Sequence, residues 1–154
     1  MYFDDCIIKA CWNGHFDIVK YLVSLGADPR ACNDEPIIKA CLSDNLDLIK
    51  YLVSLGANPR ARGDNPIEMA CANGHKEIID YLIRLGADFR ANNDGPLKYA
   101  LKSSQIDTAE YLIARGADIQ NVDIITMAGI KCYGTMEMLK YLESKGVPMP
   151  ANWL

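Results

Sequence analysis

The sequence predicts an all-α solenoid, in which helix-turn-helix repeats stack side by side. The main observation is one phrase that occurs five times at a spacing of thirty residues. Its copies are YLVSLGA at 21–27, YLVSLGA at 51–57, YLIRLGA at 81–87, YLIARGA at 111–117 and YLESKGV at 141–147. A fixed period in this range is typical of repeat proteins. The second observation is that the apolar residues within each unit follow helical spacing.

Composition excludes several classes of protein. The net charge of −4 and the absence of a lysine- or arginine-rich block argue against nucleic-acid binding. No apolar run is long enough for a membrane span, so no membrane partner is expected. The N-terminus carries acids where a signal peptide has bases, and it has no apolar core segment. We therefore expect a location in the cytoplasm or nucleus.

In the three central units, the first helix begins at an aspartate and a proline. In the unit 34–63, Asp34 can accept bonds from free backbone N–H groups, and Pro36 tolerates the first helical turn. The same combination recurs as Asp64 with Pro66 and as Asp94 with Pro96. A small residue recurs within these helices, as Ala10, Ala40, Ala70 and Ala100. It indicates that a neighbouring helix approaches closely.

The second helix follows a tight turn and ends at Gly56. Its apolar positions have helical spacing, and further leucines widen the stripe: Leu46, Ile49, Leu52 and Val53, with Leu48 and Leu55 beside them. A stripe this wide predicts burial against helices on more than one side. Asp47 and Lys50 are three residues apart and are expected to pair on the exposed side.

A polar connector, GANPRARGDNP in the second unit, joins each unit to the next. The whole chain, 1–154, is then predicted to be one domain. Its expected repeats are 4–33, 34–63, 64–93, 94–123 and 124–148, followed by a capping tail at 149–154. Terminal repeats are expected to be atypical because one face meets water. Trp153 in the tail is expected to fold back on the last repeat or to stay exposed as an anchor.

The pattern A-x-x-G-H-x-x-I-V-x-x-L-x-x-x-GAD resembles the ankyrin repeat. Its strongest copies are ACWNGHFDIVKYLVSLGAD at 10–28 and ACANGHKEIIDYLIRLGAD at 70–88, and the resemblance covers nearly the whole chain. It implies an ankyrin-type solenoid that binds proteins and catalyses nothing. The family unit has roughly 33 residues, so the thirty-residue unit implies a shortened finger loop. Units of this style resemble the ankyrin repeats of giant DNA viruses.

The cysteines and histidines do not suggest chemistry. Cys11, Cys41 and Cys71 occupy one position in successive units, and we interpret them as buried thiols in a reducing compartment. The resemblance makes His15 and His75 turn residues that bond to backbone. No cofactor motif and no metal-ligand spacing is present, so neither a cofactor nor a metal is expected. A thiol or metal enzyme remains the least favoured class.

Arginines recur in the connectors as Arg30, Arg60 and Arg90, and Gln120 interrupts the row. One interpretation is a basic rim for an acidic partner. The favoured interpretation pairs each arginine with a nearby aspartate.

The resemblance places the partner site on the concave surface, which is built from loops and first helices. Residues that vary between units while their neighbours do not are the candidates: Trp12, Lys39, Leu42, Met69, Tyr99, Lys102 and Tyr133. Mixed aromatic, apolar and basic side chains are typical of interface cores. A wet groove with scattered apolar side chains is the alternative.

For the protein, we expect a monomeric module that binds a partner protein. The alternative is a structural spacer or a self-associating unit.

Overall fold

The computed structural model describes the backbone of residues 2–133 and 135–149, and the side chains of 3–123, 126–130 and 135–149. Within this part the helices alternate in pairs: α1 (Tyr2–Trp12) with α2 (Phe16–Ser24), α3 (Ala31–Ala40) with α4 (Leu46–Ser54), α5 (Ala61–Asn73) with α6 (Lys76–Arg84), α7 (Ala91–Lys102) with α8 (Ile106–Ala114), and α9 (Ile124–Tyr133) with α10 (Met136–Ser144). A short 3-10 helix, η1, covers Ile119–Asn121. The described residues contain no strand, which confirms the predicted all-α solenoid.

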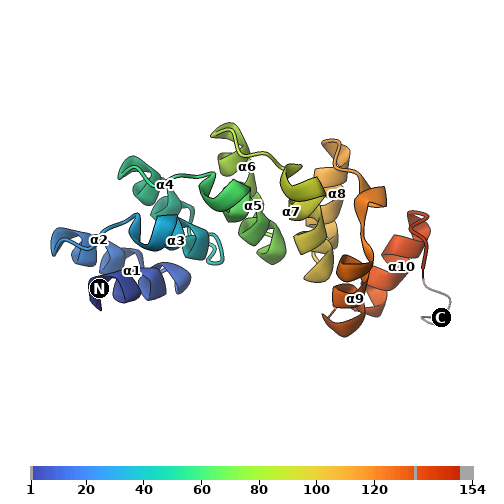
Figure 1. Cartoon of the computed structure of the whole chain (residues 1–154), viewed down its shortest axis with the longest axis horizontal. Coiled ribbons are helices and arrows are strands. Elements are labelled where there is room, and N and C mark those ends of the chain that lie inside the picture. Colours follow the sequence, from blue (N-terminus) through green and yellow to red (C-terminus); the bar gives the residue numbers. More distant parts are fainter. Residues whose placement is uncertain (1, 134, 150–154) are drawn as a thin grey trace.

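The pairs stack in order to form an arched, two-layered row (Figure 1). The odd-numbered helices lie along the inside of the arch and the even-numbered helices along the outside. Each inner helix packs on the next inner helix, as α1 does on α3, α3 on α5, α5 on α7 and α7 on α9. The two ends of the chain therefore lie at opposite ends of the row, with α1/α2 at one end and α9/α10 at the other.

The core runs along the row between the two layers. The recurring alanines are 6%, 0%, 0% and 0% exposed at Ala10, Ala40, Ala70 and Ala100. Small side chains at these positions let neighbouring inner helices approach, as the sequence predicts. The three cysteines in the row Cys11, Cys41 and Cys71 are also fully buried, which confirms their interpretation as small apolar residues. Leu55 was expected to widen the buried stripe of α4, but it is 36% exposed because it lies beyond the end of that helix.

The connectors into α3, α5 and α7 enter these helices through three consecutive residues in the left-handed region. In α3 these are Cys32, Asn33 and Asp34, at φ 52°, 58° and 60°. The matching residues of α5 and α7 have the same conformation: Arg62, Gly63 and Asp64, then Asn92, Asn93 and Asp94. This conformation turns the chain sharply within the connector, so that no extended finger is needed between neighbouring pairs.

The connector aspartate does not cap its own helix, contrary to the sequence prediction. The buried carboxylate of Asp34 accepts a bond from the backbone N–H of Asn58, in the next connector, at 3.0 Å, and another from Arg30 Nε at 3.2 Å. Its next counterpart, Asp64, accepts from the N–H of Asp88 at 3.2 Å and is paired with Arg60. The carboxylate therefore joins two neighbouring helix pairs, which explains why the aspartate recurs.

This arrangement also decides between the two interpretations of the arginine row. Arg30, Arg60 and Arg90 lie 3.2, 2.9 and 3.1 Å from the aspartate four residues later. Each guanidinium is about half exposed and is engaged by a buried carboxylate. The favoured pairing with nearby aspartates is confirmed. On the outer helices, Asp47 and Lys50 pair at 3.4 Å, as predicted.

None of the described helices has the length and apolar character that a membrane-spanning segment requires. The capping role expected of Trp153 and the rest of the tail concerns residues outside the described part, apart from Met149, which packs partly buried against the core.

Candidate partner-binding surface

The inner helices α1, α3, α5 and α7, with the residues next to them, carry a set of side chains that we call the inner face: Trp12, Glu35, Lys39, Leu42, Arg62, Met69, Tyr99 and Lys102. Six of these are candidates from the sequence, and Glu35 and Arg62 are additions from the structure. They come from the inner helices and the residues next to them, which the stacking of α1, α3, α5 and α7 brings side by side. The face therefore crosses four helix pairs.

The N-terminal half of the inner face is organised around Trp12. This indole is 57% exposed at the end of α1, and Lys39 Nζ lies 5.4 Å from its ring centroid. Lys39 also pairs with Glu35 Oε1 at 3.2 Å, and the other oxygen of Glu35 meets Arg62 at 2.5 Å. One connected line of charge and aromatic surface thus runs from the first pair to the third. Leu42 lies half-buried in the turn after α3.

The sequence does not single out Glu35 and Arg62, although a signal for both is present. The residue before the helix proline is Glu35, Asn65 or Gly95 in successive units, so the fold does not prescribe it. Arg62 occupies the position of Cys32 and Asn92, which is equally variable. Variation at a repeat position indicates freedom from the packing of the fold, and both residues meet that criterion.

The C-terminal half of the inner face surrounds a polar cavity of 360 Å³. Tyr99 and Lys102 line its rim, and Lys102 Nζ lies 5.8 Å from the Tyr99 ring centroid. Met69 is half-buried and packs against the core, so it contributes less surface than the sequence suggests. Tyr133 lies in α9, but its side chain is outside the described part of the chain.

A buried carboxylate, Glu68, also lines this cavity and is only 5% exposed. It accepts bonds from Asn92 Nδ2 at 2.8 Å and from Asn65 Nδ2 at 3.2 Å. Burial raises the pKa of the Glu68 carboxyl. The opposing Gly95 leaves room for this carboxylate, because a Cβ on it would lie 2.4 Å from Glu68 Oε1. Substituting that glycine would displace the carboxylate.

Lys98 and Asp123 form the far wall of the same cavity. Lys98 Nζ lies 2.9 Å from Asp123 Oδ2, and this bond, together with bonds from Thr126, holds the pKa of Asp123 well below its usual range. Sequence reasoning missed these residues. The sequence does contain a signal for them. At this repeat position the first two units have the apolar residues Ile8 and Ile38, and the next two units have the charged residues Glu68 and Lys98.

The buried cysteines and His75 have roles in packing and in backbone bonding. Burial raises the pKa of the Cys11 thiol to about 12, and it raises the pKa values of Cys41 and Cys71 as well. A thiol is nucleophilic as the thiolate, so these three are poorly suited to attack. His75 Nε2 lies 3.2 Å from the carbonyl oxygen of Leu42 in the preceding pair, which confirms its expected bond to backbone. In the described part, no three potential metal ligands lie close enough to hold an ion.

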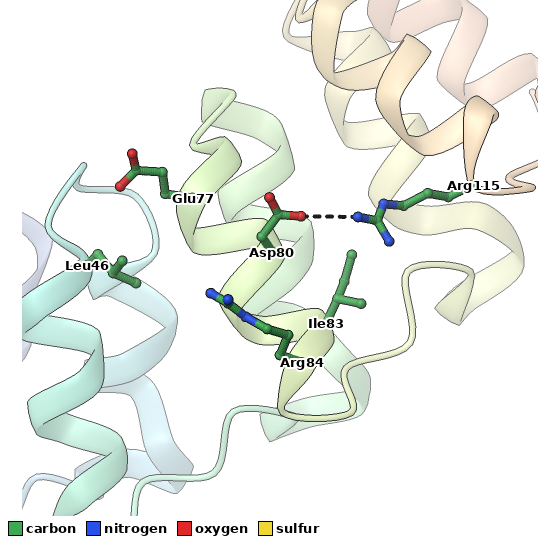
Figure 2. A pocket seen from close by; sticks show the side chains of 6 residues that line it. All are labelled: Leu46, Glu77, Asp80, Ile83, Arg84 and Arg115. Atoms are coloured by element: carbon green, nitrogen blue, oxygen red, sulfur yellow. Dashed lines mark hydrogen bonds and ion pairs between the residues drawn. The ribbon is translucent and has the colours of Figure 1, made fainter.

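A second cavity, of 390 Å³, lies on the outer side of the arch (Figure 2). Leu46 and Ile83 contribute apolar lining, and Asp80 reaches across to Arg115 Nη2 at 3.4 Å. Tyr111 donates its hydroxyl to the same carboxylate. This ion pair joins α6 to the residue after α8, so we interpret the cavity as a gap between outer helices whose charged groups stabilise the stack.

Comparison with known proteins agrees with this architecture. The family model for ankyrin repeats, which holds three copies, matches residues 7–93 and again residues 38–123. The matched stretches overlap and together cover more than half of the chain. No curated protein matches the chain significantly.

Proposed function

The chain belongs to the ankyrin repeat family, and from this premise we propose that it binds a partner protein through the inner face and catalyses no reaction. Ankyrin repeats are generally protein–protein interaction modules. The observation that carries the proposal is the exposed Trp12 with Lys39 on its ring, continued by Tyr99 and Lys102 on the same side of the arch. Exposed aromatic anchors beside basic groups are the side chains that dominate binding energy at interfaces.

The composition of the inner face favours a particular kind of partner. Lys39 and Lys102 lie over the rings of Trp12 and Tyr99, and Glu35 is already engaged by Lys39 and Arg62. A segment with an apolar or aromatic anchor flanked by acidic residues would match this pattern of charge. The polar cavity beneath Tyr99 would accept a hydrogen-bonding side chain of that segment.

The proposal extends to the setting of the protein. The thirty-residue units resemble those of giant DNA viruses, and this resemblance favours a host protein as the partner. A reducing compartment, the cytoplasm or nucleus, suits the exposed thiols of Cys6 and Cys32. We also propose that the whole chain, 1–154, acts as one domain with five repeats. A structural spacer without a dedicated partner site is the alternative function.

A pull-down with matched variants tests the proposal. The test variant is the double substitution Trp12→Ala/Tyr99→Ala. The control is Leu55→Ala/Leu85→Ala, which removes two side chains that are 36% and 37% exposed at the ends of outer helices. We expect the control to retain the proteins captured by the wild type and the test variant to lose at least one of them. If both variants retain the captured proteins equally, the assignment of the inner face as the binding surface is wrong.

A further inference from the structure

The α1/α2 end of the row exposes apolar positions that later helix pairs bury. Ile18 is 50% exposed, whereas the residues at its position in the later pairs are 0%, 0%, 4% and 0% exposed: Leu48, Ile78, Thr108 and Met138. Leu22 is half-buried where each of its later counterparts is 0% exposed: Leu52, Leu82, Leu112 and Leu142. Exposure here follows from the place in the stack and not from residue type.

The α9/α10 end shows the complementary pattern. Met136 is 69% exposed, whereas Phe16, Leu46 and Ile106 at the same position are half-buried. Leu139 is likewise half-buried where its counterparts in the first four pairs are 0% exposed: Val19, Ile49, Ile79 and Ala109. Each of these counterparts has a further helix pair stacked on its C-terminal side. Each end therefore carries one half of the surface that joins neighbouring pairs.

The contacts inside the row show which positions meet across a junction. The ring of Phe16 in α2 lies 5.4 Å from the ring of Tyr51 in α4. The same two positions meet two pairs later, where Lys76 Nζ lies 5.2 Å from the ring centroid of Tyr111. Met136 occupies the first of these positions at one end of the row.

Tyr21 occupies the second position at the other end. Among the described residues, Met136 and Tyr21 are the two most exposed large apolar side chains, at 69% and 63%. The two ends thus carry the two positions that meet at the first and third internal junctions.

We propose that copies of this chain stack end to end, with the α1/α2 end of one copy packed on the α9/α10 end of the next. The junction would repeat the internal geometry and place Met136 of one copy against Tyr21 of another. Because the two surfaces differ, the contact is heterologous and adds further copies, in a ring or in an open series, instead of stopping at a two-fold dimer. A two-fold contact would instead pack two α1/α2 ends, or two α9/α10 ends, on each other, and no described junction joins two like surfaces.

The charges at the ends are compatible with this junction. The internal junctions at α6 and α8 carry ion pairs, Asp80 with Arg115 and Glu110 with Lys145. At the proposed junction these two positions hold Lys140 and Leu25. The first two internal junctions hold the same combination, Lys20 with Leu55 and Lys50 with Leu85. The proposed contact therefore brings no like charges together at these positions.

This inference departs from the monomer that the sequence leads us to expect, and it is independent of the proposed partner-binding function. A single junction between copies lacks the covalent connector that holds internal pairs together. Association is therefore expected to be weak and to depend on concentration. Partner capture by the inner face would be unaffected by loss of the end contact.

Sedimentation of the wild-type chain over a wide concentration range, beside Tyr21→Glu and Met136→Glu, tests the proposal. We expect the average mass of the wild type to rise with concentration past that of a dimer. Each variant alone should remain a monomer, because one of its ends is blocked. An equimolar mixture of the two should form a one-to-one dimer and go no further, because each variant supplies the end that the other lacks.

Controls make the outcomes decisive. Trp12→Glu, at a site that is 57% exposed on the inner face, should associate like the wild type. Thermal melting checks that each variant is folded, and Ile18→Glu is a second variant at the Tyr21 end. A wild type that stays monomeric throughout overturns the inference. A dimer that persists in Met136→Glu alone would mean a two-fold contact and would also overturn the inference. An equal loss of association in Trp12→Glu would overturn it as well.

Discussion

The aspartates of the connectors give the sharpest test of how the row is held together. We predict that Asp64→Asn destabilises the protein. The carboxylate of Asp64 is 4% exposed and accepts bonds from Arg60 Nε at 2.9 Å, Arg60 Nη2 at 3.0 Å and the N–H of Asp88 at 3.2 Å. Asparagine suits this position because Asp64 has φ 67°, a conformation that asparagine tolerates well. The substitution therefore changes charge and hydrogen bonding without straining the backbone.

The magnitude follows from the bonds that are lost or weakened. A hydrogen bond to a charged group contributes roughly 1.5–3 kcal/mol, and a neutral one roughly 0.5–1.5 kcal/mol. The amide of asparagine keeps one acceptor oxygen for Asp88 and turns an N–H group toward the Arg60 donors. Because the arginine side chain is about half exposed to water, its share is discounted. The expected loss in free energy of unfolding is about 1–2 kcal/mol.

Urea unfolding followed by circular dichroism measures this loss. An unchanged slope of the free energy of unfolding against urea concentration, the m value, would show that the denatured state is the same. Asp47→Asn is the matched control, because Asp47 pairs with Lys50 at 3.4 Å while its side chain is 77% exposed. That control should unfold like the wild type. If Asp64→Asn is no more destabilising than Asp47→Asn, the carboxylates do not join neighbouring pairs, and the account of the connectors is wrong.

Three further predictions concern buried groups. A mild alkylating reagent should modify Cys6 and Cys32 in the folded protein and should leave the buried cysteines unmodified until the protein unfolds. Peptide mass spectrometry measures the labelling of each cysteine, and a buried thiol labelled as fast as Cys6 would contradict this prediction. Burial raises the pKa of Glu68, so the folded state holds that proton more tightly than the unfolded state, and stability falls as the pH rises through the raised pKa. Relative to the wild type, Glu68→Gln should therefore gain stability as the pH rises from acid to neutral, although its amide turns an N–H group toward one of the two asparagine donors. An unfolding difference that does not vary with pH would refute this. Ala70→Leu should cost about 1–3 kcal/mol in urea unfolding because neighbouring helices leave no room, while Ala72→Leu on the inner side should cost little.

The fold could be predicted from the sequence because the repeat period and the helical spacing both act locally. Residues at one repeat position share one environment, so the alanines and cysteines of the core were identified together. The role of Asp34 was predicted wrongly, because helix capping considers only the residue's own helix. Its bond to Asn58 crosses to the next pair, and the sharp left-handed turn that makes this possible is not visible in the pattern.

The candidate surface could be predicted only in part. Trp12, Lys39, Tyr99 and Lys102 were found because they vary at positions that the fold leaves free. Glu68 was missed because the residues at its position in the first two units, Ile8 and Ile38, are apolar and do not indicate a polar site. Partners from another unit, Asn92 above all, make its burial possible. Such pairings depend on which side chains of neighbouring pairs meet, and no single position reveals them.

The most direct test of the central claim is the affinity of a captured partner for single-site variants of the inner face. Titration calorimetry would compare the wild type, Trp12→Ala, Tyr99→Ala and the control Leu55→Ala. Truncating an interface anchor typically costs about 2 kcal/mol or more, which corresponds to a weakening of Kd by more than tenfold. We predict that loss for Trp12→Ala or Tyr99→Ala, and an unchanged Kd for Leu55→Ala. An unchanged Kd for both inner-face variants would contradict the account.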